Sequence, residues 1–249
     1  MIKHWVLAIA VIFVLPGASR AQVKVLMSGG FAATYQEILP DLEKTTGLTV
    51  TTMRGRSQGT EPDTIAAQLR RGVAADVLIM SREGLDDLIK EGKIVPGTDV
   101  DVAKTSLAMA VRAGAPKPDI RTVDAFKQTL LRAKSITVVS TTGIYLTRTL
   151  FPKLGVAKEI SSKLTIAGLA NVLSGQSEIT IQPESELHVP GVDIVGLIPK
   201  EIQYFSVFSA AIVKGSTEAE ASRRLIAFLV SESARTAIAR SGMEPVKSR

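Results

Sequence analysis

Two arginines lie close together in a short polar loop that precedes a predicted helix. The loop reads Arg54-Gly55-Arg56-Ser57-Gln58-Gly59-Thr60, so two guanidinium groups flank a glycine and are followed by hydroxyl and amide side chains. A guanidinium binds a carboxylate through two parallel hydrogen bonds, and a glycine-rich loop adds backbone N–H donors. The pattern predicts a site for an anion with two or three carboxylates, or for a phosphonate. In the alternative interpretation, both arginines are solvated charges on one face of an extended strand.

Ser28, Gly29 and Gly30 form a second small-residue segment, between a short apolar strand and an amphipathic helix. The first N–H groups of a helix lack partners within the helix and lie at the positive end of its dipole, so such a turn suits an anion. Thr142 and Gly143 repeat this arrangement later in the chain. The alternative is a plain strand-to-helix turn without a ligand. A dinucleotide site is disfavoured because the three-glycine pattern is absent.

Four side chains are candidate acids or bases: Tyr145, Glu184, Glu186 and His188. We expect both glutamates to be solvated charges at a helix start, which the helix dipole favours, with one of them a candidate base. His188 is expected to be a packed or surface-loop residue. No metal site is predicted, because cysteine is absent and His188 is the only histidine after the leader. No cofactor motif or serine-nucleophile elbow is present.

Alternating strands and helices would position these residues. Segments 48–50, 76–80, 107–111, 135–139, 179–181, 193–197 and 205–213 read as strands, and segments 62–71, 82–91, 144–154, 218–230 and 232–240 read as helices, with a further helix ending near residue 132. Pro62 is expected in the first turn of its helix, and Thr217 is expected to cap the helix that follows it. This order predicts an α/β fold with mostly parallel strands, in which ligands bind beyond the carboxyl ends of the strands.

Residues 1–21 have the pattern of a cleavable signal peptide. A basic head precedes the apolar run Trp5–Leu15, Pro16 and Gly17 follow it, and Ser19 and Ala21 supply the small residues that a signal peptidase recognises. The run is short for a membrane span, although an uncleaved anchor is the alternative. We therefore predict an exported protein whose mature chain starts near Gln22.

The composition indicates in which cellular compartment the protein lies and which class of ligand it binds. Without cysteine the mature chain carries neither a lipid on cysteine nor a disulfide, which favours a freely diffusing protein of the periplasm. The whole chain has a net charge of +6, which becomes about +4 without Lys3 and Arg20. That charge suits a small anion, and the absence of an arginine-rich run with aromatics argues against nucleic acid.

The chain resembles the molybdate-binding-protein branch of the type II periplasmic solute-binding proteins. The resemblance rests on the strand–turn–helix 25–35, on Gly72-Val73-Ala74-Ala75-Asp76-Val77-Leu78-Ile79, on Thr142-Gly143-Ile144-Tyr145 and on Lys153-Leu154-Gly155. It implies a two-lobed fold in which each lobe is a mostly parallel sheet flanked by helices. Lobe one would comprise residues 22–104 and 206–249, lobe two residues 105–205, with a ligand cleft and a hinge of two crossing strands between them.

The resemblance also implies a set of ligand-binding positions. The first-turn hydroxyl of the family falls at about Gly30, with Ser28 two residues before it, and the second hydroxyl loop corresponds to the segment 54–60. A backbone N–H position falls at Thr142, and the tyrosine of molybdate binders falls near Gln182 or Pro183, where no tyrosine is present. A tetrahedral dianion that relatives bind without charged side chains does not need two arginines, so these departures favour a carboxylate ligand.

The resemblance predicts a solute-binding protein, and an enzyme is the alternative. In the first, the protein captures an oxyanion or polycarboxylate and delivers it as a monomer to an ABC-type permease in the inner membrane. In the second, it is an aconitate isomerase, since some exported members of this branch interconvert trans- and cis-aconitate. That reaction needs arginines for the carboxylates and a base that moves a proton between two carbons.

Overall fold

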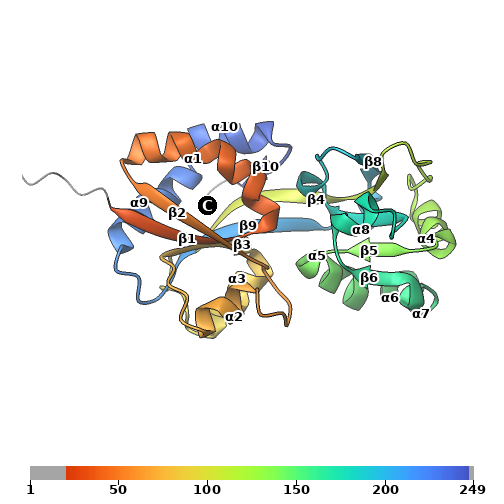
Figure 1. Ribbon diagram of the computed structural model, residues 1–249, viewed down its shortest axis with the longest axis horizontal. Helices are drawn as coiled ribbons and strands as arrows, with labels where there is room; N and C mark the ends of the chain where they lie inside the picture. The colour runs from red at the N-terminus through yellow and green to blue at the C-terminus, as the bar shows by residue number, and fades with distance from the viewer. Residues whose placement is uncertain (1–20, 247–249) are drawn as a thin grey trace, which may run out of the picture.

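The computed structural model describes residues 21–246, so the predicted signal peptide lies almost wholly outside the described residues. One sheet runs through the molecule in the order β2-β1-β3-β9-β4-β7-β5-β6, and β8 and β10 pair with β4 (Figure 1). The strands are β1 (Gln22–Ser28), β2 (Thr49–Gly55), β3 (Val77–Ser81), β4 (Val100–Arg112), β5 (Ile136–Val138), β6 (Leu164–Ile166), β7 (Ile179–Pro183), β8 (Val192–Leu197), β9 (Phe205–Ile212) and β10 (Glu244–Pro245).

Helices pack against both parts of this sheet. They are α1 (Ala32–Thr46), α2 (Ile65–Arg70), α3 (Arg82–Lys90), α4 (Val123–Arg132), α5 (Ser140–Tyr145), α6 (Phe151–Leu154), α7 (Ala157–Ile160), α8 (Leu169–Leu173), α9 (Ala219–Leu229) and α10 (Glu232–Arg240). Short 3₁₀ turns are η1 (Gly29–Phe31), η3 (Ser161–Lys163), η4 (Glu184–Glu186) and η5 (Lys200–Ile202), and η2 (Leu146–Leu150) is a π-helical turn. The mixture of strands and helices confirms the predicted α/β class.

The first part of the sheet is covered on both faces. Strands β1, β2 and β3 are parallel, and their side chains point alternately to two separate cores. Val25 and Met27 of β1 pack with α1, α9 and α10, whereas Leu26 packs with α2 and α3. Helix α1 turns Tyr35, Ile38 and other apolar residues towards the sheet at the spacing that the sequence predicts.

The second part of the sheet has its own core. β5 pairs in parallel with β6 and β7, and β7 pairs antiparallel with β4. Phe126 of α4 and Phe151 of α6 are buried in a cluster that shares no residue with the cores of the first part. Because the two parts of the sheet have separate cores, they form two lobes.

Strands β4 and β9 connect the two parts (Figure 1). The beginning of β4 pairs with β9, and its end, from Leu107 to Arg112, pairs with β7 and β8. The chain therefore crosses between the parts on two adjacent antiparallel strands. The exact lobe bounds 22–104 plus 206–249 and 105–205 stay a prediction.

Three predicted helix starts are wrong. Helix α2 begins at Ile65 rather than Pro62, because the Thr64 side chain accepts a hydrogen bond from the N–H of Ala67 at 3.2 Å. The segment around Gly143 lies inside α5, because its N–H already donates to the carbonyl of Val139 in the first helical turn. The third is the start of helix α9 (Ala219–Leu229).

Thr217 does not cap helix α9. The hydroxyl of Ser216 accepts the N–H of Glu218 instead, at 3.1 Å, and the helix begins at Ala219. Strand β6 and helix α8 were not predicted, and β6 has a mostly exposed, weakly patterned sequence. Within residues 21–246, no helix combines the length and apolar composition that a membrane crossing requires.

Candidate functional site

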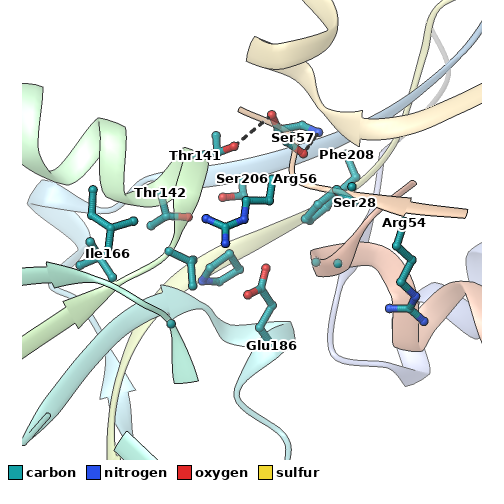
Figure 2. A pocket seen from close by; sticks show the side chains of 18 of the residues that line it. Ser28, Arg54, Arg56, Ser57, Thr141, Thr142, Ile166, Glu186, Ser206 and Phe208 are labelled. Atoms are coloured by element: carbon teal, nitrogen blue, oxygen red, sulfur yellow. Dashed lines mark hydrogen bonds between the residues drawn. The ribbon is translucent and has the colours of Figure 1, made fainter. Parts of the chain in front are cut away.

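A cavity of about 420 Å³ lies where the two parts of the molecule face one another (Figure 2). The first part contributes the ends of β1, β2 and β3 and the beginning of β9, and the second contributes the ends of β5, β6 and β7 with the start of α5. Its lining residues are Ser28, Gly29, Gly30, Arg54, Gly55, Arg56, Ser57, Asp63, Ser81, Val138, Val139, Thr141, Thr142, Ile166, Ala167, Gly168, Pro183, Glu186, Ser206 and Phe208. We call this cavity the cleft.

The end of β1 brings a buried hydroxyl to the cleft. Ser28 is only 4% exposed, and its Oγ has no hydrogen-bond partner among the described residues. Gly29 and Gly30 follow in the 3₁₀ turn η1. Ser206 on β9 is 3% exposed and its hydroxyl is likewise without a partner in the described part of the chain. Buried hydroxyls without protein partners are costly, so these two hydroxyls are available to donate hydrogen bonds to a ligand in the cleft.

The arginine loop follows β2, which pairs in parallel with β1 and places Gly55 beside Ser28. Arg56 forms exposed ion pairs with Asp63 at 3.0 Å and Glu61 at 3.7 Å. Exposed pairs contribute at most about 1 kcal/mol, so a ligand carboxylate can compete for this guanidinium.

Arg54 differs from its neighbour. It forms no ion pair within residues 21–246, and Figure 2 shows its guanidinium turned away from the middle of the cleft, while that of Arg56 reaches into it. Arg54 also lines a second cavity, of about 750 Å³, which meets the cleft at Gly29, Gly30, Val139 and Glu186.

Hydroxyl groups from the two parts of the molecule approach one another at the cleft. The Oγ of Ser57 accepts the N–H of Ser81 at 2.9 Å, and the Ser81 hydroxyl lies 3.4 Å from that of Thr141 on the opposite side. Thr142 is 1% exposed and lines the cleft next to Thr141. The sequence predicted Ser57 and Thr142 but missed Ser81, Thr141 and Ser206.

Several predicted site residues lie elsewhere. Gln58 and Thr60 line a neighbouring cavity of about 260 Å³ with α2 and α3. Gly143 is buried against Val138 inside α5. Gln182 donates to the hydroxyl of Thr180 at 2.6 Å and lines the 750 Å³ cavity. Their part in ligand binding stays a prediction.

Tyr145 also lies away from the cleft. Its ring stacks on that of Tyr204, with 4.1 Å between the ring centroids. Burial raises the pKa of Tyr145, and burial together with a hydrogen bond to the Glu83 carboxylate raises the pKa of Tyr204. Both phenols therefore remain protonated at neutral pH.

Glu186 lies in a different environment from the solvated one that the sequence predicts. It ends the 3₁₀ turn η4, but instead of being solvated at a helix start it is partly buried and lines both the cleft and the 750 Å³ cavity. A β-carbon on Gly30 would lie 2.5 Å from its Oε1 and 2.6 Å from the ring of Phe208, so a larger residue at this position would displace one of these side chains. Loss of water on burial raises the pKa of Glu186 from 4.5 to about 7.

The cleft has the chemistry of an anion site with a titratable carboxyl group in its wall. It combines guanidinium groups, unpaired hydroxyls and the backbone of a glycine turn. Over residues 21–246, no group of three histidine, cysteine, aspartate or glutamate side chains is arranged to hold a metal ion.

Comparisons with known proteins agree with this architecture. Residues 23–244 match the family model of the bacterial extracellular solute-binding proteins. An aconitate isomerase from Pseudomonas sp. is 41% identical over 231 residues, which cover 90% of this chain and 88% of that protein.

Solved structures of anion-binding proteins have the same fold. The molybdate-binding protein of Azotobacter vinelandii superposes with a TM-score of 0.71 at 18% identity, covering 91% of this chain and 100% of that one. The sulfate-binding protein SubI of Mycobacterium tuberculosis gives a TM-score of 0.72 at 19% identity, covering 91% and 88%. These similarities confirm the predicted two-lobed fold, and the chain belongs to the bacterial extracellular solute-binding protein family.

Proposed function

We propose that this protein is an exported aconitate isomerase that interconverts trans- and cis-aconitate in the cleft. The observation that carries the proposal is the set of carboxylate-binding groups in the cleft, two guanidinium groups and two buried hydroxyls without partners, in a chain 41% identical to an aconitate isomerase. Aconitate carries three carboxylates, so a site that holds it needs several donors directed at one small space.

The chemistry matches these donors. Moving the double bond of aconitate requires breaking a C–H bond next to a carboxylate-bearing carbon, and negative charge then spreads onto the adjoining carboxylates. Fixed donors such as Arg56, Ser28 and Ser206 stabilise such charge most where it develops, because they need no reorganisation during the reaction. The same donors would bind the ground state, so affinity alone does not distinguish an enzyme from a receptor.

A receptor for a polycarboxylate is the second candidate. The family is one of extracellular solute-binding proteins, and one structural relative is the substrate-binding domain of a putative molybdenum ABC transporter of Clostridium difficile, at a TM-score of 0.66. In this alternative the lobes close over the anion and deliver it, as a monomer, to an ABC permease. Location in the periplasm and removal of residues 1–21 are part of both proposals.

Proton NMR of trans-aconitate with the purified mature protein, followed over hours, tests the proposal. We expect the olefinic signal of cis-aconitate to grow, and to be absent both without protein and with a variant in which Arg54 and Arg56 are alanine. Line broadening of the tricarboxylate without turnover would support the receptor instead. A thermal shift with molybdate, and no response to aconitate or citrate, would contradict the carboxylate assignment.

A further inference from the structure

Glu186 is an unusual residue for the wall of an anion-binding cleft. Its carboxylate points into the cleft (Figure 2), and within the described part of the chain it has neither a hydrogen bond nor an ion pair. An ionised carboxylate at this place repels a bound carboxylate and also loses hydration by burial. For binding alone, the residue is therefore unfavourable.

The backbone keeps this carboxyl group in place. Gly30 leaves room for Oε1, and the ring of Phe208 lies against the same space. Phe208 in turn packs on Phe31, with 5.9 Å between ring centroids. An apolar wall on one side and a glycine turn on the other hold the carboxyl group at the boundary between the cleft and the 750 Å³ cavity.

The other candidate bases are placed less suitably. Tyr145 stacks on Tyr204 outside the cleft. Glu184, in the same turn as Glu186, lines neither the cleft nor the 750 Å³ cavity. His188 lines only the second cavity, near Gly242. Of the four candidates, Glu186 is the one that lines the cleft.

We infer that Glu186 is the catalytic base that removes a proton from aconitate and returns it to another carbon. This inference rests on the proposed function and deepens it. In the first step, the carboxylate oxygen takes a proton from the methylene carbon of trans-aconitate. The C–H electron pair becomes part of a delocalised carbanion, whose charge spreads onto the carboxylates bound by the arginines.

In the second step, the neutral carboxyl group gives the proton to the carbon at the other end of the allylic system. The O–H bond breaks, a new C–H bond forms, and the double bond has moved by one position with cis geometry. No electrons are exchanged with another reactant and no water is consumed, so the carboxyl group ends as it began.

The protonation behaviour of Glu186 suits this role. The ionisable groups that share its two cavities are Arg54, Arg56, Asp63, Glu37, His188 and Arg240. Loss of hydration raises the pKa of the Glu186 carboxyl group to about 7, so both protonation states are accessible near neutral pH. A base with a pKa near the working pH can both accept and return a proton efficiently.

The experiment compares the mature wild-type protein with Glu186→Gln, Glu186→Asp and the matched control Glu184→Gln. We expect Glu186→Gln to lower the turnover of trans-aconitate at least about a hundredfold. Its affinity for trans-aconitate, measured by calorimetry, should stay the same or increase, since a negative charge has left the cleft. Glu184→Gln should retain turnover.

Deuterium incorporation adds a readout that a structural role would not change. In D₂O the Glu186 carboxyl group, which lines an open cleft, exchanges the abstracted proton with solvent between the two steps, so the wild-type protein should place deuterium on carbon of part of the cis-aconitate product, and Glu186→Gln should place none. Glu186→Asp keeps the charge but shortens the side chain, and it should lose at least about tenfold in turnover while binding normally; it also serves if the glutamine variant fails to fold. If the wild type converts trans-aconitate and Glu186→Gln converts it equally fast, Glu186 is not the base, and the proposed function still stands. No turnover by the wild type would overturn the proposed function and this assignment with it.

Discussion

Replacing Glu186 by glutamine should change how the stability of the protein depends on pH. The folded state raises the pKa of this carboxyl group from 4.5 to about 7, so folding favours its protonated form. The stabilisation of the folded wild type by the protonated carboxyl group is therefore fully present below about pH 4.5, and it is lost as the pH rises through about 7. Glutamine has no proton to lose, so the variant escapes this loss.

The magnitude follows from the same pKa values. The rise from 4.5 to about 7 corresponds to about 3 kcal/mol, at about 1.4 kcal/mol per pH unit. Because the side chain keeps some contact with solvent, screening reduces this value, and we expect about 1 to 2 kcal/mol. For a chain of this size, that is a difference of about 3–6 °C in Tm.

The assay is thermal unfolding of the mature wild type, Glu186→Gln and Glu184→Gln at pH 4.5 and pH 8. The Tm of Glu186→Gln relative to the wild type should rise by about 3–6 °C between these pH values. Glu184→Gln measures the effect of removing one negative charge from the same turn. If the curves for Glu186→Gln and the wild type run parallel over this range, the carboxyl group is not desolvated in the folded protein and the reasoning fails.

Four further substitutions test the site and the fold. Arg54→Ala and Arg56→Ala should each weaken binding of trans-aconitate more than tenfold by calorimetry, because each removes a guanidinium group that lines the cleft, and unchanged affinity in both would remove this loop from the site. Gly30→Ala should displace the Glu186 side chain and lower turnover, with a loss of about 1–3 kcal/mol in unfolding free energy; full activity would show that the contact is not tight. Thr64→Ala should cost about 1 kcal/mol in denaturant unfolding by removing the cap of α2, without changing ligand affinity, and an unchanged stability would show that the cap is not made in solution.

Local sequence patterns predicted most of the elements. The apolar run before Ser81 forms β3, and the helical spacing of Tyr35 and Ile38 forms α1, because these patterns bury a face wherever the element is placed. The start of α2 was missed because two residues competed as start signals, and the hydrogen bond of Thr64 decided between them. Strand β6 was missed because its mostly exposed position leaves no strong apolar pattern.

The candidate site was predicted only in part. The Ser28–Gly30 turn, Arg54, Arg56, Ser57 and Thr142 meet in the cleft, since the carboxyl ends of neighbouring strands lie at one edge. Ser206 was hidden in an apolar strand, and nothing in that strand indicates which way its hydroxyl points.

The sequence by itself determined the class of fold and predicted an anionic ligand, because strand and helix patterns and a loop with two arginines are local properties. Only the tertiary structure distinguished Glu186 from Glu184. The two glutamates lie in one short turn with the same local charge, but only one packs against Gly30 and Phe208 from the opposite part of the molecule. Burial, and the pKa shift that it causes, depends on residues far apart in the chain, and these meet only when the two lobes are assembled.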